Sequence, residues 1–465
     1  MLADSHAGIP SGIHSNSTAC PQACFNRLRL TSTMAASDRS TIAHLLRRTG
    51  FGPTATEVDA AVTKGFDAVV DELLSTTSPD PADATPSPTF VPYMPMGQKN
   101  LTVQQRQAMN QQRAHEIADI QTWWLNRMAT TGRPLREKLT FFWHDHFATS
   151  YEKVRRPDYL YRQNQLFRSM GMGQFENLTQ AVAKDPAMLV WLDAASDKKA
   201  HPNENFAREM MELFVLGLGA YSEDDVREAA RAFTGWYVNQ KIDGWSLVPA
   251  QHDAGLKTVL GQTGPWGGEQ VIHIAVNHPA SAPFIVARLW SHFAYPVSTD
   301  DAVVNDHAPR FAADRDIASL MRRMLLDDRF VSPTARTGLV KQPVEWLVGG
   351  LRALKLPATG PRLVAGLRQL GQVPFEPPNV GGWPQNEYWL TTASSLARLN
   401  IASALTRQAE LAEISAAAPS SRPDAAAHLL SVEWSDQTAR SLDQVSADPK
   451  ELVTLALVSP EFVLA

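Results

Sequence analysis

Cysteine is almost absent from this chain of 465 residues, which contains only Cys20 and Cys24. Both lie within residues 1–33, a stretch of Ser, Gly, Pro, Asn and His without hydrophobic periodicity, which we expect to be a disordered N-terminal tail. A core that depends on disulfides is therefore excluded. Because a lone Cys-x-x-x-Cys pair is weak as a metal site, we interpret both cysteines as unpaired thiols. Met34 begins a more typical globular sequence and is an alternative start of translation.

Long apolar runs are missing as well. No run approaches the roughly 20 residues that a helix needs to cross a bilayer, so we predict no transmembrane segment. Residues 1–33 also lack the apolar stretch of a secretory signal, and the chain as written is therefore expected in the cytoplasm. The formal net charge of −5 is small for this length and argues against general electrostatic binding of nucleic acids.

Strand signals are scarce, whereas helical periodicity recurs along most of the sequence. A hydrophobic content of 44% and a charged content of 20% are typical of globular proteins. We therefore predict a mainly α fold, in which residues 40–465 form one large multi-helix domain with irregular loops and little β structure. Residues 78–96 are rich in proline and indicate a linker or a long surface excursion. Residues 237–260 are the best candidate for a short β element.

Residues 201–236 predict two consecutive helices. Asn203 is a good N-cap for the first helix, and Ser222 and Asp225 have the spacing of a capping box for the second. Glycines between the two helical patterns mark a short turn, so we expect antiparallel neighbours whose apolar stripes pack together.

Charged side chains gather on the polar faces of these two helices. Glu204, Arg208, Glu209 and Glu212 share one face of the first helix, and Arg231 lies on the second. Crowded carboxylates raise one another's pKa, so this arrangement predicts a metal site or an acid–base cluster. The alternative is a salt-bridged, exposed helix face without chemistry.

Two histidines lie close together in the segment Trp143-His144-Asp145-His146. In a regular helix His144 and His146 point about 200° apart and cannot chelate a metal from one face. Their imidazoles could converge if the helix ended near Trp143. We predict them as ligands of a divalent metal ion, with Glu212 as a further ligand, or as a proton-transfer group. Structural packing is the alternative.

Two Gly-containing loops carry further candidate residues. A Gly-flanked loop contains His252, Asp253 and Lys257. It is a plausible lid of a site or an anion contact. The alternative is that these polar side chains only face solvent. Asn379 and Trp383 lie in a rigid loop rich in Pro and Gly. They could form a cleft wall or stack a sugar ring, and a purely structural turn is the alternative.

Five motifs follow one another along the chain: Arg136-Glu137-Lys138 leading to Trp143-His144-x-His146-Phe147, Asn203-Glu204-Asn205-x-Ala207-Arg208-Glu209, Glu228-Ala229-Ala230-Arg231 running to Thr234-Gly235-Trp236, His252-Asp253-x-Gly255-x-Lys257, and Pro378-Asn379-Val380-x-Gly382-Trp383-Pro384. In this order they resemble the DUF1800 family, a bacterial family of unknown function, from about Leu45 to Phe462. The resemblance implies a possible partner of the DUF1501 family, because many relatives are encoded beside such a protein, which itself resembles sulfatases. Many relatives are also exported, and this chain departs from them by lacking an export signal.

The motifs together predict one polar cleft that hydrolyses a polar, anionic or glycan-like substrate by metal-assisted or carboxylate-based chemistry. The predicted site comprises the catalytic residues Glu204, Arg208, Glu209, Arg231, His252, Asp253 and Lys257, the substrate-binding residues Asn379 and Trp383, and the metal ligands His144, His146 and Glu212. The alternative function is that of a non-catalytic binding or assembly protein, whose charged motifs form a buried ion-pair network that fixes helix packing.

Overall fold

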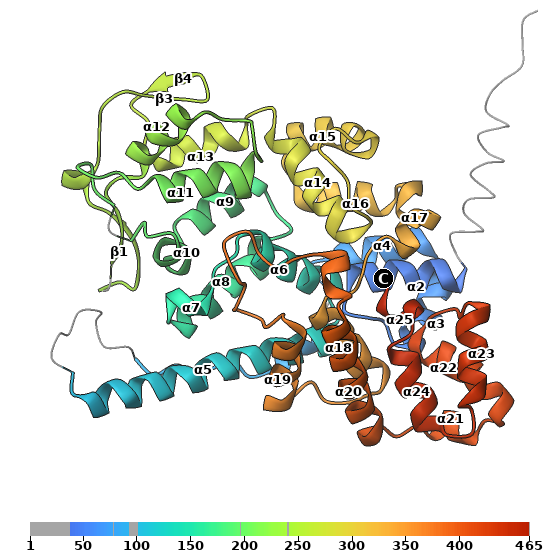
Figure 1. Cartoon of the computed structure of the whole chain (residues 1–465). Coiled ribbons are helices and arrows are strands. Elements are labelled where there is room, and N and C mark those ends of the chain that lie inside the picture. Colours follow the sequence, from blue (N-terminus) through green and yellow to red (C-terminus); the bar gives the residue numbers. More distant parts are fainter. Residues whose placement is uncertain (1–37, 78, 93–100, 196, 240, 465) are drawn as a thin grey trace, which may run out of the picture.

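The computed structural model describes residues 38–77, 79–92, 101–195, 197–239 and 241–464. The predicted tail, both cysteines and Met34 lie outside these residues. Helices follow one another along the described chain, and the predicted mainly α fold is confirmed (Figure 1). The first half contains α2 (Arg39–Thr49), α3 (Ala55–Lys64), α4 (Phe66–Leu74), the 3-10 helix η1 (Pro81–Ala84), α5 (Val103–Thr130), α6 (Pro134–His146), α7 (Tyr151–Val154), α8 (Pro157–Met170), α9 (Phe175–Ala183), α10 (Pro186–Trp191), α11 (Glu204–Glu209), the π-helix η2 (Met210–Val215) and α12 (Glu223–Phe233).

The second half is also helical. It contains η3 (Pro249–Gln251), α13 (Gly268–Val276), α14 (Ser281–Phe293), α15 (Ala302–Asp314), α16 (Ile317–Leu325), η4 (Asp328–Val331), α17 (Pro333–Thr337), α18 (Pro343–Ala353), α19 (Pro361–Leu370), η5 (Asn386–Trp389), α20 (Thr392–Gln408), α21 (Ala412–Ala416), η6 (Pro419–Ser421), α22 (Arg422–Leu430), α23 (Asp436–Gln444), α24 (Pro449–Leu457) and α25 (Pro460–Val463). The sequence pattern did not predict α15, because Pro309 lies inside it and a proline normally ends a helix. None of the described helices is long and apolar enough to cross a membrane.

The β structure of the described residues consists of two antiparallel hairpins. Strand β1 (Trp236–Asn239) pairs with β2 (Gly244–Leu247), and β3 (Lys257–Val259) pairs with β4 (Gln262–Gly264). Both hairpins lie at or near residues 237–260, where the sequence predicted a short β element. The second hairpin places the loop that carries His252, Asp253 and Lys257 against α12.

Helix α6 lies between two hydrophobic cores and belongs to both. Its residues Leu139, Phe142 and Trp143 are part of a core built mainly from α2–α4 and α9–α16. Phe141 belongs to a second core, built mainly from α5, α18–α20 and α22–α25. Because both faces of α6 are covered, its polar residues near His144 are buried as well.

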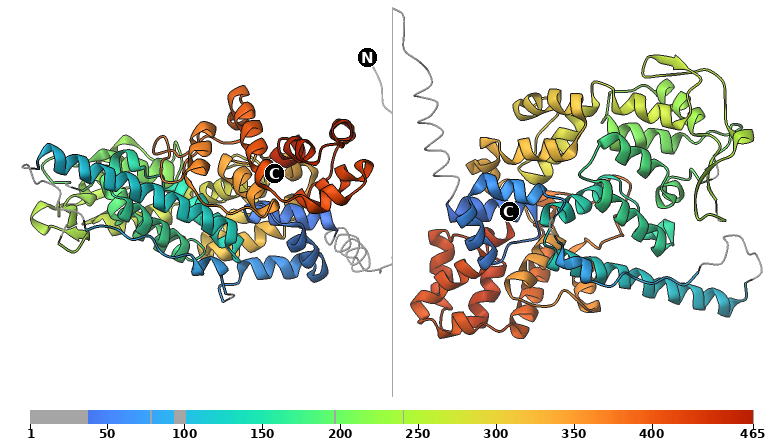
Figure 2. Two further views of the ribbon diagram at one scale, coloured as in Figure 1. Left: turned by 90° about the horizontal axis from the view of Figure 1, so that it is seen from below. Right: turned by 180° about the vertical axis from the view of Figure 1, so that it is seen from behind.

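The first and last helices of the described chain lie side by side (Figures 1 and 2). The guanidinium of Arg47 in α2 donates to the carbonyl of Ser431, at the end of α22, at 2.6 Å. The backbone of Val340 forms an isolated antiparallel bridge with Leu464. The C-terminal helices are therefore built into the body of the protein and do not form a separate appendage.

The described part of the Pro-rich segment runs along α5. Arg127 of α5 donates to the carbonyl of Ala82 at 2.8 Å and to the carboxylate of Asp83 at 3.0 Å. Further along, the side chain of Glu116 accepts a hydrogen bond from the backbone of Val91 at 2.9 Å. These bonds attach the segment to the helix over much of its length, and only residues 78 and 93–96 of the predicted excursion lie outside the described chain.

Candidate functional site

The predicted helix after Asn203 begins as expected but does not continue as one regular α-helix. The side chain of Asn203 accepts from the backbone of Asn205 at 3.0 Å, which confirms the predicted N-cap. The α-helical hydrogen bonding ends at Glu209, and residues 210–215 continue as a π-helix. Short π-helical segments are frequent at functional sites, and this one places Glu209 and Glu212 at the change of geometry.

Arg208 connects this helix to the next one. Its two terminal nitrogens donate to the two carboxylate oxygens of Glu223, each at 2.7 Å, while Glu204 lies 3.8 Å away. Glu223 is the first residue of α12, whose capping box of Ser222 and Asp225 is present as predicted. The sequence placed Arg208 among the carboxylates of its own helix. In the structure it instead connects α11 to α12.

Glu209 and Glu212 are half-buried carboxyl groups with different surroundings. The hydroxyl of Tyr221 donates a hydrogen bond to Glu212. The side chain of Glu209 makes no hydrogen bond or ion pair to any of the described residues. Burial and then the charge of Glu212 raise the pKa of Glu209, and Arg208 opposes this shift only in part. Glu209 is therefore a carboxyl group that takes up a proton more readily than an exposed glutamate does.

Arg231 is surrounded by acceptors on three sides. Its Nε donates to Asp253 at 2.7 Å, and one terminal nitrogen donates to both oxygens of Glu228 at 2.9 Å and to the carbonyl of Leu256 at 3.1 Å. The hydrogen bond from Arg231 is the main reason that the pKa of Asp253 falls to about 2. The hydrogen bonds of Arg231 therefore attach the loop at 252–257 to α12.

The other two candidates in this loop serve the same attachment. His252 donates from Nδ1 to the carbonyl of Thr234 at 2.9 Å, which fixes its tautomer. The ammonium group of Lys257 is buried and donates to the carbonyls of Asp253 at 2.5 Å and Gly255 at 2.9 Å. The structure thus brings Arg231, His252, Asp253 and Lys257 together, with their polar atoms directed at one another.

His144 and His146 point to opposite sides of α6, because the helix continues as far as His146. Nε2 of His144 accepts the backbone N–H of Phe375 at 3.0 Å, in the second core. Nε2 of His146 donates to the carbonyl of Phe214 at 3.0 Å, in the first core. Burial lowers the pKa of each imidazole to about 3, so both are neutral.

These two histidines do not converge with Glu212. Within the described ranges, no group of three or more His, Cys, Asp or Glu side chains is arranged to hold a metal ion. Nδ1 of His146 and Nε2 of His292 are both buried without a hydrogen-bond partner in the described chain. The predicted set of metal ligands is therefore not brought together by the fold.

The loop that carries Asn379 and Trp383 is held by Asp145, a residue that the sequence analysis passed over. Asp145 accepts the backbone N–H of Trp383 at 2.7 Å. Gly382, with φ of +86°, lies so close to this carboxylate that a Cβ atom would collide with it. Burial raises the pKa of Asp145 to about 6, and the charge of Arg288 acts in the opposite direction.

Asn379 and Trp383 face different surroundings. The Trp383 side chain is buried, and its ring lies 6.3 Å from that of Phe141 and 5.5 Å from that of His144, measured between centroids. Asn379 is exposed, and its side-chain oxygen accepts the backbone N–H of Gly381 at 2.8 Å. The two do not form one binding wall, because the aromatic ring belongs to the core.

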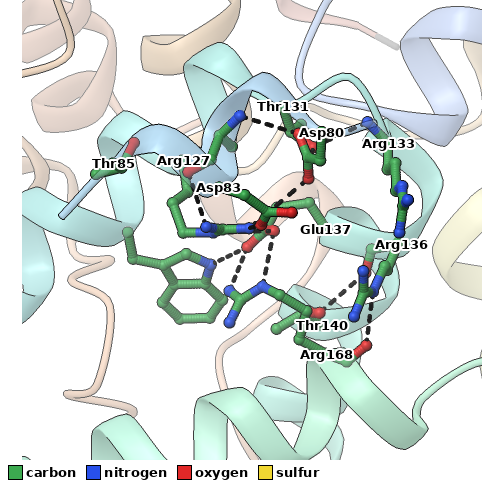
Figure 3. Close-up of polar contacts among 12 residues, drawn as sticks. Asp80, Asp83, Thr85, Arg127, Thr131, Arg133, Arg136, Glu137, Thr140 and Arg168 are labelled. Carbon is green, nitrogen blue, oxygen red and sulfur yellow. Dashed lines mark hydrogen bonds and ion pairs between the residues drawn. The ribbon is translucent and has the colours of Figure 1, made fainter. Parts of the chain in front are cut away.

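Glu137, in the first of the five motifs, is the centre of a buried polar network (Figure 3). It accepts from the indole of Trp124 at 2.6 Å and from Nε of Arg168 at 3.0 Å, and Arg127 lies 3.8 Å away. Burial alone would raise the pKa of Glu137, but the charge and hydrogen bonds of Arg168, with those of Arg127 and Trp124, lower it below its usual value. This network joins α5, α6 and α8.

A family model described as "Protein of unknown function (DUF1800)" matches residues 44–464. No curated protein and no solved structure matches the chain. The matched residues include all five motifs described above.

Proposed function

Because the chain belongs to the DUF1800 family, whose function is not established, we propose a function from its site alone: carboxylate-based hydrolysis, with Glu209 as the general base. The observation that carries this proposal is the state of Glu209. It is half-buried, its pKa is raised by burial and by Glu212, and it has no partner among the described residues. Unpaired carboxyl groups with raised pKa values are suited to proton transfer at neutral pH.

In this proposal Glu209 removes a proton from a water molecule as the water oxygen bonds to the substrate and the bond to the leaving group breaks. The leaving oxygen then takes up the proton that Glu209 has accepted. Glu212 adds to the basicity of Glu209 by its charge and is itself held by the hydroxyl of Tyr221. Arg208 has a positioning role, because its paired bonds to Glu223 hold α11 against α12.

The charge of this face favours an uncharged substrate. Glu204, Glu209, Glu212 and Glu223 lie around the guanidinium of Arg208, and Arg227 adds one further positive charge near Glu223. An anionic substrate would meet net repulsion here. Of the substrate classes that the sequence predicts, we therefore favour the neutral, glycan-like one. Glu212 accepts a hydrogen bond from the hydroxyl of Tyr221, and no imidazole of the described residues bonds to it. A divalent metal ion stays a prediction.

The test is hydrolysis of a panel of 4-nitrophenyl glycosides and 4-nitrophenyl acetate by the wild type and by Glu209→Gln. We expect the variant to lose about 10²- to 10⁴-fold in rate and to keep the melting temperature, because Glu209 has no bond to lose. Glu204→Gln is the matched control on the same face, with its side chain 48% exposed. Equal rates in wild type and Glu209→Gln, or no turnover of any probe by the wild type, would reject the proposal.

A second candidate function is that of a non-catalytic binding or assembly protein. The hydrogen bonds of Arg231 favour it. Arg231 directs its donors at the carboxylates of Asp253 and Glu228, so few of these polar atoms remain to bind a substrate. In either function we assign Arg231, His252, Asp253 and Lys257 to positioning the loop at 252–257. A partner of the DUF1501 family and a cytoplasmic location stay predictions.

A further inference from the structure

A large pocket lies between the first and the last helices of the described chain. These helices lie far from α11 (Figure 1). The volume of the pocket, about 870 Å³, is within the usual range for small-molecule sites. Its lining includes Arg47 from α2, Arg336 from α17, Trp434 and residues of α23. A smaller pocket of about 240 Å³, lined by Ser431 among others, adjoins it and shares Arg47.

Among the described residues, neither guanidinium group in the pocket wall forms an ion pair within 4 Å, although the charge of Glu433 acts on Arg47. Arg336 donates to the hydroxyls of Ser40 at 3.0 Å and Thr41 at 2.6 Å, and Arg47 donates to the carbonyl of Ser431. Both therefore bond only to neutral oxygens. Burial and then the charge of Arg336 lower the pKa of Arg47 to about 10, as expected for cations that face each other.

Further basic groups lie behind this wall. Arg48 and Lys341 are 2% and 4% exposed. Lys341 donates to the carbonyl of Phe462 at 2.7 Å, and Lys138 forms an ion pair with Glu345. Burial, followed by the charge of Arg47, lowers the pKa of Lys341. The lining of the pocket itself is balanced, with Arg47 and Arg336 against Glu433 and Glu461. The excess of positive charge comes from the buried groups nearby, since Arg48, Lys138 and Lys341 stand against Glu345.

Several buried donors here lack acceptors. Nε of Arg47, Nε and Nη1 of Arg48, and the hydroxyl of Ser431 are buried without a hydrogen-bond partner in the described chain. Buried polar atoms are normally satisfied, because each unpaired one costs about 1–3 kcal/mol. Ser431 itself is 2% exposed and lines the smaller pocket. Of these groups, Arg47 and Ser431 line the pockets, and unpaired donors beside two arginines are an arrangement that an anionic ligand completes.

We propose that this pocket binds the phosphate group of a small phosphorylated polyol or sugar, with Arg47 and Arg336 as its phosphate contacts. Arginine forks match phosphate oxygens in geometry and charge. The remaining wall suits a hydroxylated body, because it offers the hydroxyls of Ser40, Thr337, Ser435, Thr438, Ser441 and Ser459, the amide of Gln437 and the ring of Trp434. Glu433, which also lines the pocket, supplies a carboxylate that can accept from ligand hydroxyls. This site is separate from the proposed hydrolytic face.

Isothermal titration calorimetry of the full chain with glucose 6-phosphate, inorganic phosphate and glucose, at constant ionic strength, tests the proposal. We expect glucose 6-phosphate to bind more tightly than inorganic phosphate, and glucose to show no binding. Arg47→Gln should weaken binding of glucose 6-phosphate by about tenfold or more, because it removes a charged hydrogen bond. The matched control is Arg362→Gln, an exposed arginine on α19 that does not line the pocket.

Ser441→Trp keeps every charge and places a large ring in the pocket, from an exposed position on α23. It should abolish binding if the pocket is the site, and it provides an answer even if Arg47→Gln fails to fold. Equal affinity for inorganic phosphate and glucose 6-phosphate would support the phosphate site and reject the sugar body. Binding of glucose alone, no binding of either phosphate by the wild type, or unchanged binding in both variants would overturn the proposal.

Discussion

The carboxylate of Asp145 accepts the backbone N–H of Trp383 at 2.7 Å, across 238 residues of sequence. Together with the bond from the backbone N–H of Phe375 to His144, it attaches the loop at 371–391 to the central helix α6. The Asp145 bond joins two of the five family motifs, the one around His144 and the one around Gly382. The buried Asp145 is therefore a direct contact between these motifs, and its titration can be followed.

Replacing Asp145 should change how stability depends on pH. Burial raises the pKa of Asp145 from 3.8 to about 6, so between these values the folded state binds more protons than the unfolded state. Its contribution to stability therefore falls as the pH rises through this window, by roughly 3 kcal/mol at most. Asp145→Asn keeps an acceptor for Trp383 and removes the charge. Relative to wild type, the variant should gain stability in urea unfolding from pH 4 to pH 7. A constant difference between the two across this range would contradict the assignment, and Asp328→Asn, an exposed change, is the control.

Substituting Gly382 should be far more costly than substituting another glycine of the same backbone conformation. Gly382 and Gly219 have φ of +86° and +82°, but only at Gly382 would a Cβ atom meet a neighbour, the Asp145 carboxylate. Gly219→Ala should lose about 1 kcal/mol or slightly more from backbone strain alone. Gly382→Ala should lose several kcal/mol more in the free energy of unfolding. Similar losses for the two variants would show that the loop can move away from Asp145.

The neutral histidines of α6 should destabilise the protein in acid. Burial lowers the pKa of His144 and of His146 from 6.5 to about 3. Below pH 6.5 the unfolded chain takes up protons that the folded chain cannot, so the stability that both provide above this pH is lost as the pH falls toward 3. His144→Gln can still accept from Phe375 but does not titrate. The variant should be less stable at pH 7, because Gln packs less well, and it should lose less stability than wild type between pH 7 and pH 5. An unchanged loss would show that His144 is not the source.

Replacing Arg231 separates the two candidate functions. Arg231→Lys cannot reproduce the bonds to Asp253, Glu228 and the carbonyl of Leu256, so we expect a loss of about 1–3 kcal/mol in the free energy of unfolding. Arg227→Lys, on the same helix with a side chain that is 60% exposed, should change stability by less than about 0.5 kcal/mol. Below the melting temperature, hydrolysis of the 4-nitrophenyl probes by Arg231→Lys should equal that of wild type. A selective loss of rate with unchanged stability would move Arg231 into the catalytic machinery.

Local sequence signals predicted the elements around the site but not the contacts that give its residues their roles. The N-cap at Asn203 and the capping box of Ser222 and Asp225 depend on a few neighbouring residues, and both are present. The partner of Arg208 proved to be Glu223 on the next helix, and the sequence pattern alone could equally place it with Glu212. The π-helix was not predicted, because its apolar spacing over six residues resembles that of an α-helix.

Buried polar residues were the hardest to predict. Asp145 lies between two histidines in a helical pattern and gives no local sign that its partner is 238 residues away. Glu137 resembles a solvent-exposed helix residue until α5 and α8 cover it with Trp124 and Arg168. The pocket with Arg47 and Arg336 could not be predicted for the same reason, since these arginines are 289 residues apart in the sequence. Tertiary contacts decide the environment of each of these groups.

The side-by-side placement of α2 and the C-terminal helices has a consequence for biosynthesis. The second core contains Phe51 together with residues of α24 and α25, such as Leu457 and Phe462. Ribosomes add about 5–20 residues per second, so α2 emerges tens of seconds before the helices that cover it. During that time Arg47 lacks the carbonyl of Ser431, and Phe51 lacks its C-terminal neighbours in the second core, so this part of the protein stays incomplete until those helices have been synthesised.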